Sequence, residues 1–96
     1  MKSLVRIEIL IDSAHCAALE SILRRISIRR TILLNTVEAK GFDADLRREG
    51  YADLLGTSLL IAYANPEIFE SAKPELLQFL KKCGGAAFQS SVECVN

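Results

Sequence analysis

The residue types that most often carry chemistry are few in this chain. The one histidine, His15, is followed by Cys16, and together they could supply two metal ligands. Neighbouring helix positions point about 100° apart, so adjacent residues rarely bind one ion. No serine or aspartate stands at a triad spacing from His15, and the carboxylates form no pair suited to acid–base work. Because nucleotide-loop, zinc-protease and nucleophile-elbow motifs are absent too, the sequence predicts no enzyme, no catalytic residue and no metal site.

Three arginine pairs are the second feature that could do chemistry. They are Arg24 with Arg25, Arg29 with Arg30, and Arg47 with Arg48. A guanidinium group is planar and binds carboxylate or phosphate through two hydrogen bonds. The pairs fit either anion contacts or ordinary solvent-exposed charge, and the sequence leaves both interpretations open.

Composition limits the classes of protein that fit. The 96 residues are enough for a single domain, 1–96, and the 12 basic and 12 acidic residues give a formal net charge of zero. Nucleic-acid-binding domains usually carry a basic excess, and a transmembrane helix needs about 20 apolar residues in a row. The chain also has no signal-peptide pattern. Its three cysteines, Cys16, Cys83 and Cys94, lack a CxxC spacing. We therefore expect a cytoplasmic protein with reduced thiols that neither binds nucleic acid nor is embedded in a membrane.

Hydrophobic periodicity shows which elements position these residues. Alternating apolar residues predict strands, and apolar residues three or four apart predict helices. The predicted order is β-α-β-β-α-β, with strands at 4–12, 31–38, 57–64 and 86–95 and helices at 13–26 and from Pro66 to the glycines at 84 and 85. Asp12 or Ser13 can cap the first helix and Asn65 the second. We expect Pro74 to kink or divide the second helix.

This order predicts the α+β, ferredoxin-like fold, a four-stranded antiparallel sheet with two helices on one face. Residues 39–56 fit neither period, so we expect a long loop between the second and third strands. A loop of this length in a small domain is usually functional or disordered.

The second face of the predicted sheet should be polar in a monomer. The sequence instead has further apolar positions, out of phase with the core set or on a strand that is apolar on both sides: Leu4, Leu10, Leu33, Val37, Leu60 and Ala62. On the second strand, Ile32 and Leu34 should share one face, and Leu33 and Val37 the other. We expect the second face to pack against further copies of the chain.

One short motif is more specific than the predicted fold. The segment Glu38-Ala39-Lys40-Gly41-Phe42-Asp43 resembles the E-V-K/R-G-F-G segment at which the PII signal-transduction proteins leave their second strand and enter the T-loop. Residues 48–55, REGYADLL, are loosely similar to the far end of that loop. Gly84 and Gly85 fall near the family's B-loop, where Ala86 replaces its phosphate-binding lysine. With Asp43 replacing the second T-loop glycine, the departures indicate the divergent PII-like group, whose members respond to AMP, ADP or cyclic nucleotides.

The resemblance implies a homotrimer that binds a small anionic effector, most simply AMP, ADP, ATP or a cyclic nucleotide, in clefts between subunits. It implies ligand contacts at Lys40, Gly41, Phe42, Gly84 and Gly85. It further implies that residues 39–56 act as a T-loop, with Arg47, Arg48 and Tyr51 contacting a membrane transporter or an enzyme. Such proteins act in inorganic-carbon or nitrogen metabolism, and no firmly bound cofactor is expected.

Other classes of protein remain open on the sequence. A trimeric interaction module without a nucleotide site fits the lost lysine. A CutA-type trimer linked to divalent metals would need ligands that this chain barely has, and an ACT-type amino-acid sensor leaves residues 39–56 unexplained. A small enzyme of the same fold has no residue to nominate as catalytic.

Overall fold

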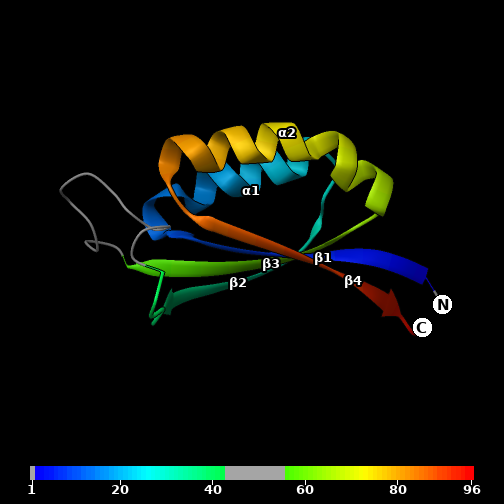
Figure 1. Cartoon of the computed structure of the whole chain (residues 1–96), viewed down its shortest axis with the longest axis horizontal. Helices are drawn as coiled ribbons and strands as arrows, with labels where there is room; N and C mark the ends of the chain where they lie inside the picture. Colours follow the sequence, from blue (N-terminus) through cyan, green and yellow to red (C-terminus); the bar gives the residue numbers. More distant parts are fainter. Residues whose placement is uncertain (1, 43–55) are drawn as a thin grey trace.

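The computed structural model describes residues 2–42 and 56–96, and Figure 1 shows their arrangement. The elements are β1 (Lys2–Asp12), η1 (Ser13–His15), α1 (Cys16–Arg25), β2 (Arg30–Val37), β3 (Thr57–Ala64), α2 (Pro66–Cys83) and β4 (Ala86–Cys94). The described strands form one antiparallel sheet in the order β2-β3-β1-β4, with both helices on one face. The predicted ferredoxin-like fold is confirmed.

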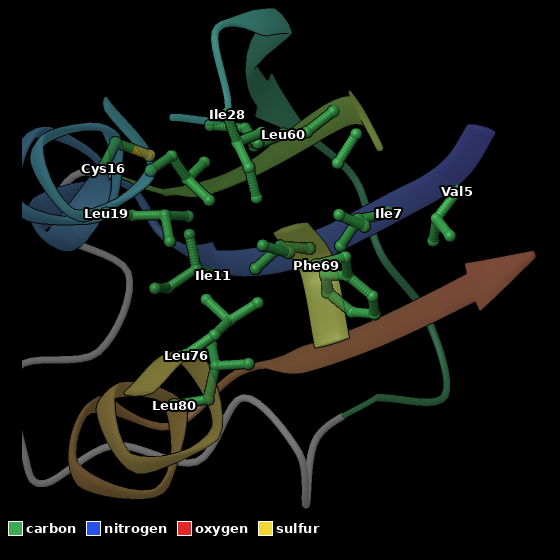
Figure 2. Close-up of a cluster of buried hydrophobic side chains, with 14 residues drawn as sticks. Val5, Ile7, Ile11, Cys16, Leu19, Ile28, Leu60, Phe69, Leu76 and Leu80 are labelled. Carbon is green, nitrogen blue, oxygen red and sulfur yellow. The ribbon is translucent and has the colours of Figure 1, made fainter. Parts of the chain in front are cut away.

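The core lies between the sheet and the two helices. Every second residue of β1 is buried there because side chains alternate along a strand, and Ile9 and Ile11 are 0% exposed. The helices contribute a stripe each, namely Cys16, Leu19 and Leu23 from α1 and Phe69, Leu76 and Leu80 from α2. In Figure 2 the labelled side chains of the two helices, among them Leu19, Phe69 and Leu76, point into the space between the layers. Burial of each large side chain contributes about 1.5–3 kcal/mol, so this cluster is the main source of stability.

Helix α2 begins as predicted but is not divided. The Oδ1 atom of Asn65 accepts hydrogen bonds from the amides of Glu67 (2.8 Å) and Ile68 (3.2 Å), a capping arrangement. The expectation that Pro74 could divide the helix is wrong, because α2 continues through it. Proline inside a helix costs about 3 kcal/mol. Buried residues stand on both sides of Pro74, so a continuous apolar stripe offsets that cost.

Helix α1 is shorter than the predicted helix at 13–26. Residues Ser13–His15 form a 3-10 turn, and the α-helix begins at Cys16. Asp12 caps the turn, since its Oδ1 accepts from the amide of Ala14 at 3.0 Å. The N-terminus of this helical region therefore lies directly at the end of β1.

The sheet face away from the helices, called here the open face, is apolar as predicted. Leu4 and Leu10 lie on it, on the side of β1 opposite the core residues, but other residues differ from those expected. Exposed fractions reach 49% at Ile32, 45% at Leu34 and 50% at Phe88. Leu60 and Ala62 are instead fully buried under the helices. Strand β3 buries only its even-numbered side chains. Because its residues are apolar on both sides, the sequence did not show which of them face the helices.

The prediction that Leu33 and Val37 share a face is also wrong. Leu33 pairs with the buried Leu60 and lies on the helix side. Between Leu34 and Val37 the register shifts by one residue, so Val37 pairs with Thr57 on the open face. The extra residue is Thr36, whose φ is +57°. A β-bulge of this kind moves the following side chains to the opposite face, which sequence alternation does not reveal.

Candidate functional site

The structure brings Phe42, a predicted site residue, to Phe88, which the sequence analysis did not single out. Phe42 and Phe88 meet edge to face, with ring centroids 6.1 Å apart and planes at 75°. Phe88 lies two residues into β4, which follows directly on Gly84 and Gly85. The segment at residues 38–42 thus leaves the β2 edge of the sheet and contacts the β4 edge. This end of the sheet lies away from the two chain termini (Figure 1).

The three predicted glycines have positive φ, for different reasons. Gly84 ends α2 at φ +79°, and its amide donates to the Leu80 carbonyl at 2.8 Å. Gly85, at φ +126°, passes so close to β1 that a Cβ there would lie 2.9 Å from the Leu10 oxygen. Gly41, at φ +85°, has open space where a Cβ would stand. Gly84 and Gly85 therefore have structural roles, whereas the backbone at Gly41 is open to a ligand.

Lys40 is placed at the surface. Its Nζ lies 3.6 Å from the Glu38 carboxylate, and the two side chains are 83% and 81% exposed. Such a pair contributes little to stability, so the ammonium group can exchange its partner for an anion. The predicted partner contacts Arg47, Arg48 and Tyr51, and Asp43 of the motif, lie outside the described residues.

The sequence analysis missed a polar cluster at the end of β2, formed by Ser13, Asn35 and Ser58. The Ser58 hydroxyl lies 3.2 Å from Asn35 Oδ1 and 2.6 Å from Ser13 Oγ. Ser58 is 0% exposed and is the one buried polar residue in the described part of the chain. The signal was visible, because Ser58 is a polar residue at the start of a strand that is otherwise almost wholly apolar.

The open face carries a second polar group that was not singled out. Arg6 Nε donates to Glu8 Oε2 at 2.9 Å, and its Nη1 donates to the Tyr63 hydroxyl at 3.2 Å. The Arg6 guanidinium also lies 5.9 Å from the Tyr63 ring centroid. Arg6 and Tyr63 border a hollow of about 370 Å³ at the end of the sheet near the termini. Its lining also includes Leu4, Arg30, Val92, Glu93 and Cys94. Because polar groups must keep hydrogen-bond partners when they are covered, this network restricts how another surface can pack on the open face.

The arginines near the end of α1 give no preference for contact with an anion over ordinary surface charge. Arg25 forms an ion pair with Glu75 of α2. Arg24 and Arg29 line a smaller hollow of about 140 Å³, together with Glu20 and Thr31. The hollow could admit only a small ion, and Glu20 places a carboxylate in it. This lining does not favour an anion over solvent.

Within residues 2–42 and 56–96, no cluster of three or more histidine, cysteine or acidic side chains could hold a metal ion. The cysteines there are free: Cys16 is buried, whereas Cys83 and Cys94 are half-buried. No described helix is long and apolar enough to cross a membrane.

Comparison with solved structures places the fold in one class. The chain superposes on CPII from Thiomonas intermedia K12 bound to ADP, AMP and acetate, with a TM-score of 0.79 and 16% identity over 99% of this chain and 91% of that one. The apo form of CPII, described as a nitrogen regulatory PII-like protein, gives 0.74 and 14% over 96% and 91%. A putative PII-like signalling protein from Thermus thermophilus gives 0.71 and 11% over 95% and 87%. The fold is that of the PII-like proteins. No family model and no curated protein matches the chain.

Proposed function

We propose that this protein is a trimeric, non-enzymatic PII-like regulator that binds an adenine nucleotide between subunits. Its central segment, residues 39–56, would then signal to a transporter or enzyme, with Arg47, Arg48 and Tyr51 as contacts. The observation that carries the proposal is the meeting of Phe42 with Phe88 next to Gly84 and Gly85. A protein of the same fold, CPII, was solved with ADP and AMP.

The chemistry of this region suits a nucleotide. Phe42 and Phe88 offer aromatic surface to a purine ring, and Phe88 is half exposed. Gly41 leaves its backbone accessible, and the ammonium group of Lys40 lies beside the exposed carboxylate of Glu38. An aromatic platform, an open backbone and an exposed ammonium group match the base and the phosphates of one ligand.

The open face supports assembly of several copies. Its exposed apolar side chains come from β2 and β4, with half-buried ones between them on β3. An apolar sheet face of this kind is usually covered by another surface. The Arg6–Glu8–Tyr63 network would then restrict the register in which copies meet. We propose a homotrimer assembled through this face.

Isothermal titration calorimetry tests nucleotide binding. AMP, ADP, ATP and the cyclic mononucleotides are titrated with and without Mg²⁺ and bicarbonate. We expect saturable binding of one nucleotide, weakened in Lys40→Ala and Gly41→Ala and unchanged in Lys2→Ala, which removes a lysine at the opposite end of the sheet. Equal heats in all variants would contradict the site.

A trimeric interaction module without a nucleotide site is the second candidate, favoured by Ala86 beside Gly85. A ligand that binds only the folded protein raises its melting temperature. A trimer whose melting temperature no nucleotide changes would therefore support this candidate. The first candidate function predicts that the protein acts in the cytoplasm, as a regulator of inorganic-carbon or nitrogen metabolism.

A further inference from the structure

Three chain segments meet at the hydroxyl of Ser58. Asn35 Oδ1 can only accept, so Ser58 donates to it at 3.2 Å. That bond uses the single hydroxyl proton of Ser58, and the 2.6 Å contact therefore has Ser13 donating to Ser58. Ser13 makes a second hydrogen bond, in which its amide donates to the Gly56 carbonyl at 2.9 Å. We call Ser13, Asn35 and Ser58 the hydroxyl cluster.

The hydroxyl cluster joins the start of the helical region, the end of β2 and the start of β3. Asn35 is the last residue of β2 before the bulge, and Gly56 is the residue before β3. Thr36 and Gly56 are neighbours in space, since a Cβ on Gly56 would lie 3.9 Å from the Thr36 methyl. The cluster thus holds the chain where it leaves β2 and where it enters β3.

Thr36 is the strained member of this arrangement. Its φ of +57° places a β-branched residue in the left-handed region, an uncommon and unfavourable conformation. Such a conformation persists only where neighbouring contacts hold it. Asn35 on one side is bonded to Ser58, and Val37 on the other is paired with Thr57. The bond at Asn35 fixes that residue in register, so the extra residue of the bulge must be Thr36.

The position of the bulge decides where the next residues go. If the pairing of β2 with β3 shifted by one residue, Val37 would move to the helix side of the sheet. The direction in which residues 38–42 leave the strand would change as well. With the bulge at Thr36, residues 38–42 run to β4, where Phe42 meets Phe88.

We infer that Ser58 is a positioning residue. Its hydroxyl, oriented by Ser13, fixes Asn35 and so keeps Thr36 left-handed, which directs Gly41 and Phe42 toward β4. The effect on a ligand rests on the proposed function, whereas the effect on Thr36 does not.

Nuclear magnetic resonance of Ser58→Ala tests this directly. The Cα and Cβ chemical shifts and the three-bond HN–Hα coupling of Thr36 report its φ. We expect them to move toward extended values in Ser58→Ala, with faster hydrogen exchange at the Ser13 amide. Ser91→Ala removes an exposed serine of β4 whose side chain makes no hydrogen bond to the described residues, and it should leave both unchanged. A folded Ser58→Ala variant whose Thr36 keeps a positive φ would overturn the inference.

Two further variants keep the test usable if Ser58→Ala does not fold. Asn35→Ala acts at an exposed position and should shift Thr36 in the same direction. Ser13→Ala leaves the bond between Ser58 and Asn35 in place, so its shift should be smaller. If the Thr36 chemical shifts changed more in Ser13→Ala than in Asn35→Ala, the proposal that Ser13 acts on Thr36 through Ser58 and Asn35 would be contradicted.

Nucleotide titration of the same variants separates this inference from the proposed function. If the binding arrangement falls to about a tenth of the population, the apparent Kd rises about tenfold. A shifted Thr36 with that loss supports the inference, and a shifted Thr36 with unchanged affinity overturns its link to the ligand. If the wild type binds no nucleotide, the proposed function fails, while the Thr36 measurement still decides the role of Ser58.

Discussion

Gly85 lies against the backbone of Leu10, so closely that a Cβ on Gly85 would stand 2.9 Å from the Leu10 carbonyl oxygen. Its φ of +126° is also one that side chains rarely adopt. This contact joins the end of α2 to β1 just before β4 begins. It therefore sets the position of the strand that carries Phe88.

Gly85→Ala should be strongly destabilising for both reasons. The backbone strain costs about 1–3 kcal/mol, and the overlap with a carbonyl oxygen adds to it. We expect a loss of about 3 kcal/mol or more in the free energy of unfolding, measured by urea denaturation. Gly41→Ala is the matched control, because its φ is positive but its Cβ would meet no atom of the described residues within 4 Å. Its loss should be about 1 kcal/mol. Equal losses in the two variants would show that the Leu10 contact does not matter.

Thr36→Asn should stabilise the protein. Asparagine adopts the left-handed region more readily than a β-branched residue, so the penalty at φ +57° becomes smaller. We expect a gain of about 0.5–1 kcal/mol in the free energy of unfolding. Thr31→Asn is the control in the extended part of β2, where the lower strand propensity of asparagine should make it destabilising. A destabilised Thr36→Asn would mean that the side chain of Thr36, rather than its backbone, is important.

The sequence predicted the fold because its strongest patterns come from burial. The alternating residues of β1 are buried as expected, and Asn65 with Pro66 fixed the start of α2 by local capping. Pro74 and Thr36 show where local reasoning failed. Pro74 is tolerated because residues distant in sequence bury the stripe around it. Thr36 is placed by contacts with β3 that no single segment encodes.

The candidate site was only partly predictable. Gly41 and Phe42 were singled out through the short motif, and Gly84 and Gly85 through their place near the B-loop of the family that the chain resembles. The contact of Phe42 with Phe88 of β4 was not predicted. The hydroxyl cluster and the partnership of Arg6 with Tyr63 were not found, because each joins residues from different strands. Pairings of this kind depend on register, and in β2 the register changes at the bulge.

The rings of Phe42 and Phe88 should be energetically coupled. Edge-to-face pairs contribute about 0.5–1.5 kcal/mol beyond their buried area. A double-mutant cycle with Phe42→Leu and Phe88→Leu keeps apolar volume at both positions and isolates that term. We expect a coupling of about 0.5–1 kcal/mol in unfolding by urea. Additive losses would place the two rings too far apart to interact in solution.

A charge on the open face should break the assembly. Ile32 is 49% exposed there, and in the proposed trimer it would be covered by another copy. An aspartate at a covered apolar position leaves an unpaired charge away from water, which costs several kcal/mol unless the copies separate. We therefore expect Ile32→Asp to be a folded monomer in analytical ultracentrifugation while the wild type is a trimer. Leu77→Asp is the control, because Leu77 is 54% exposed on α2 and lies on the helical side of the molecule. If Leu77→Asp separates the copies and Ile32→Asp does not, assembly uses the helices, and the exposed apolar residues of β2 and β4 have another partner.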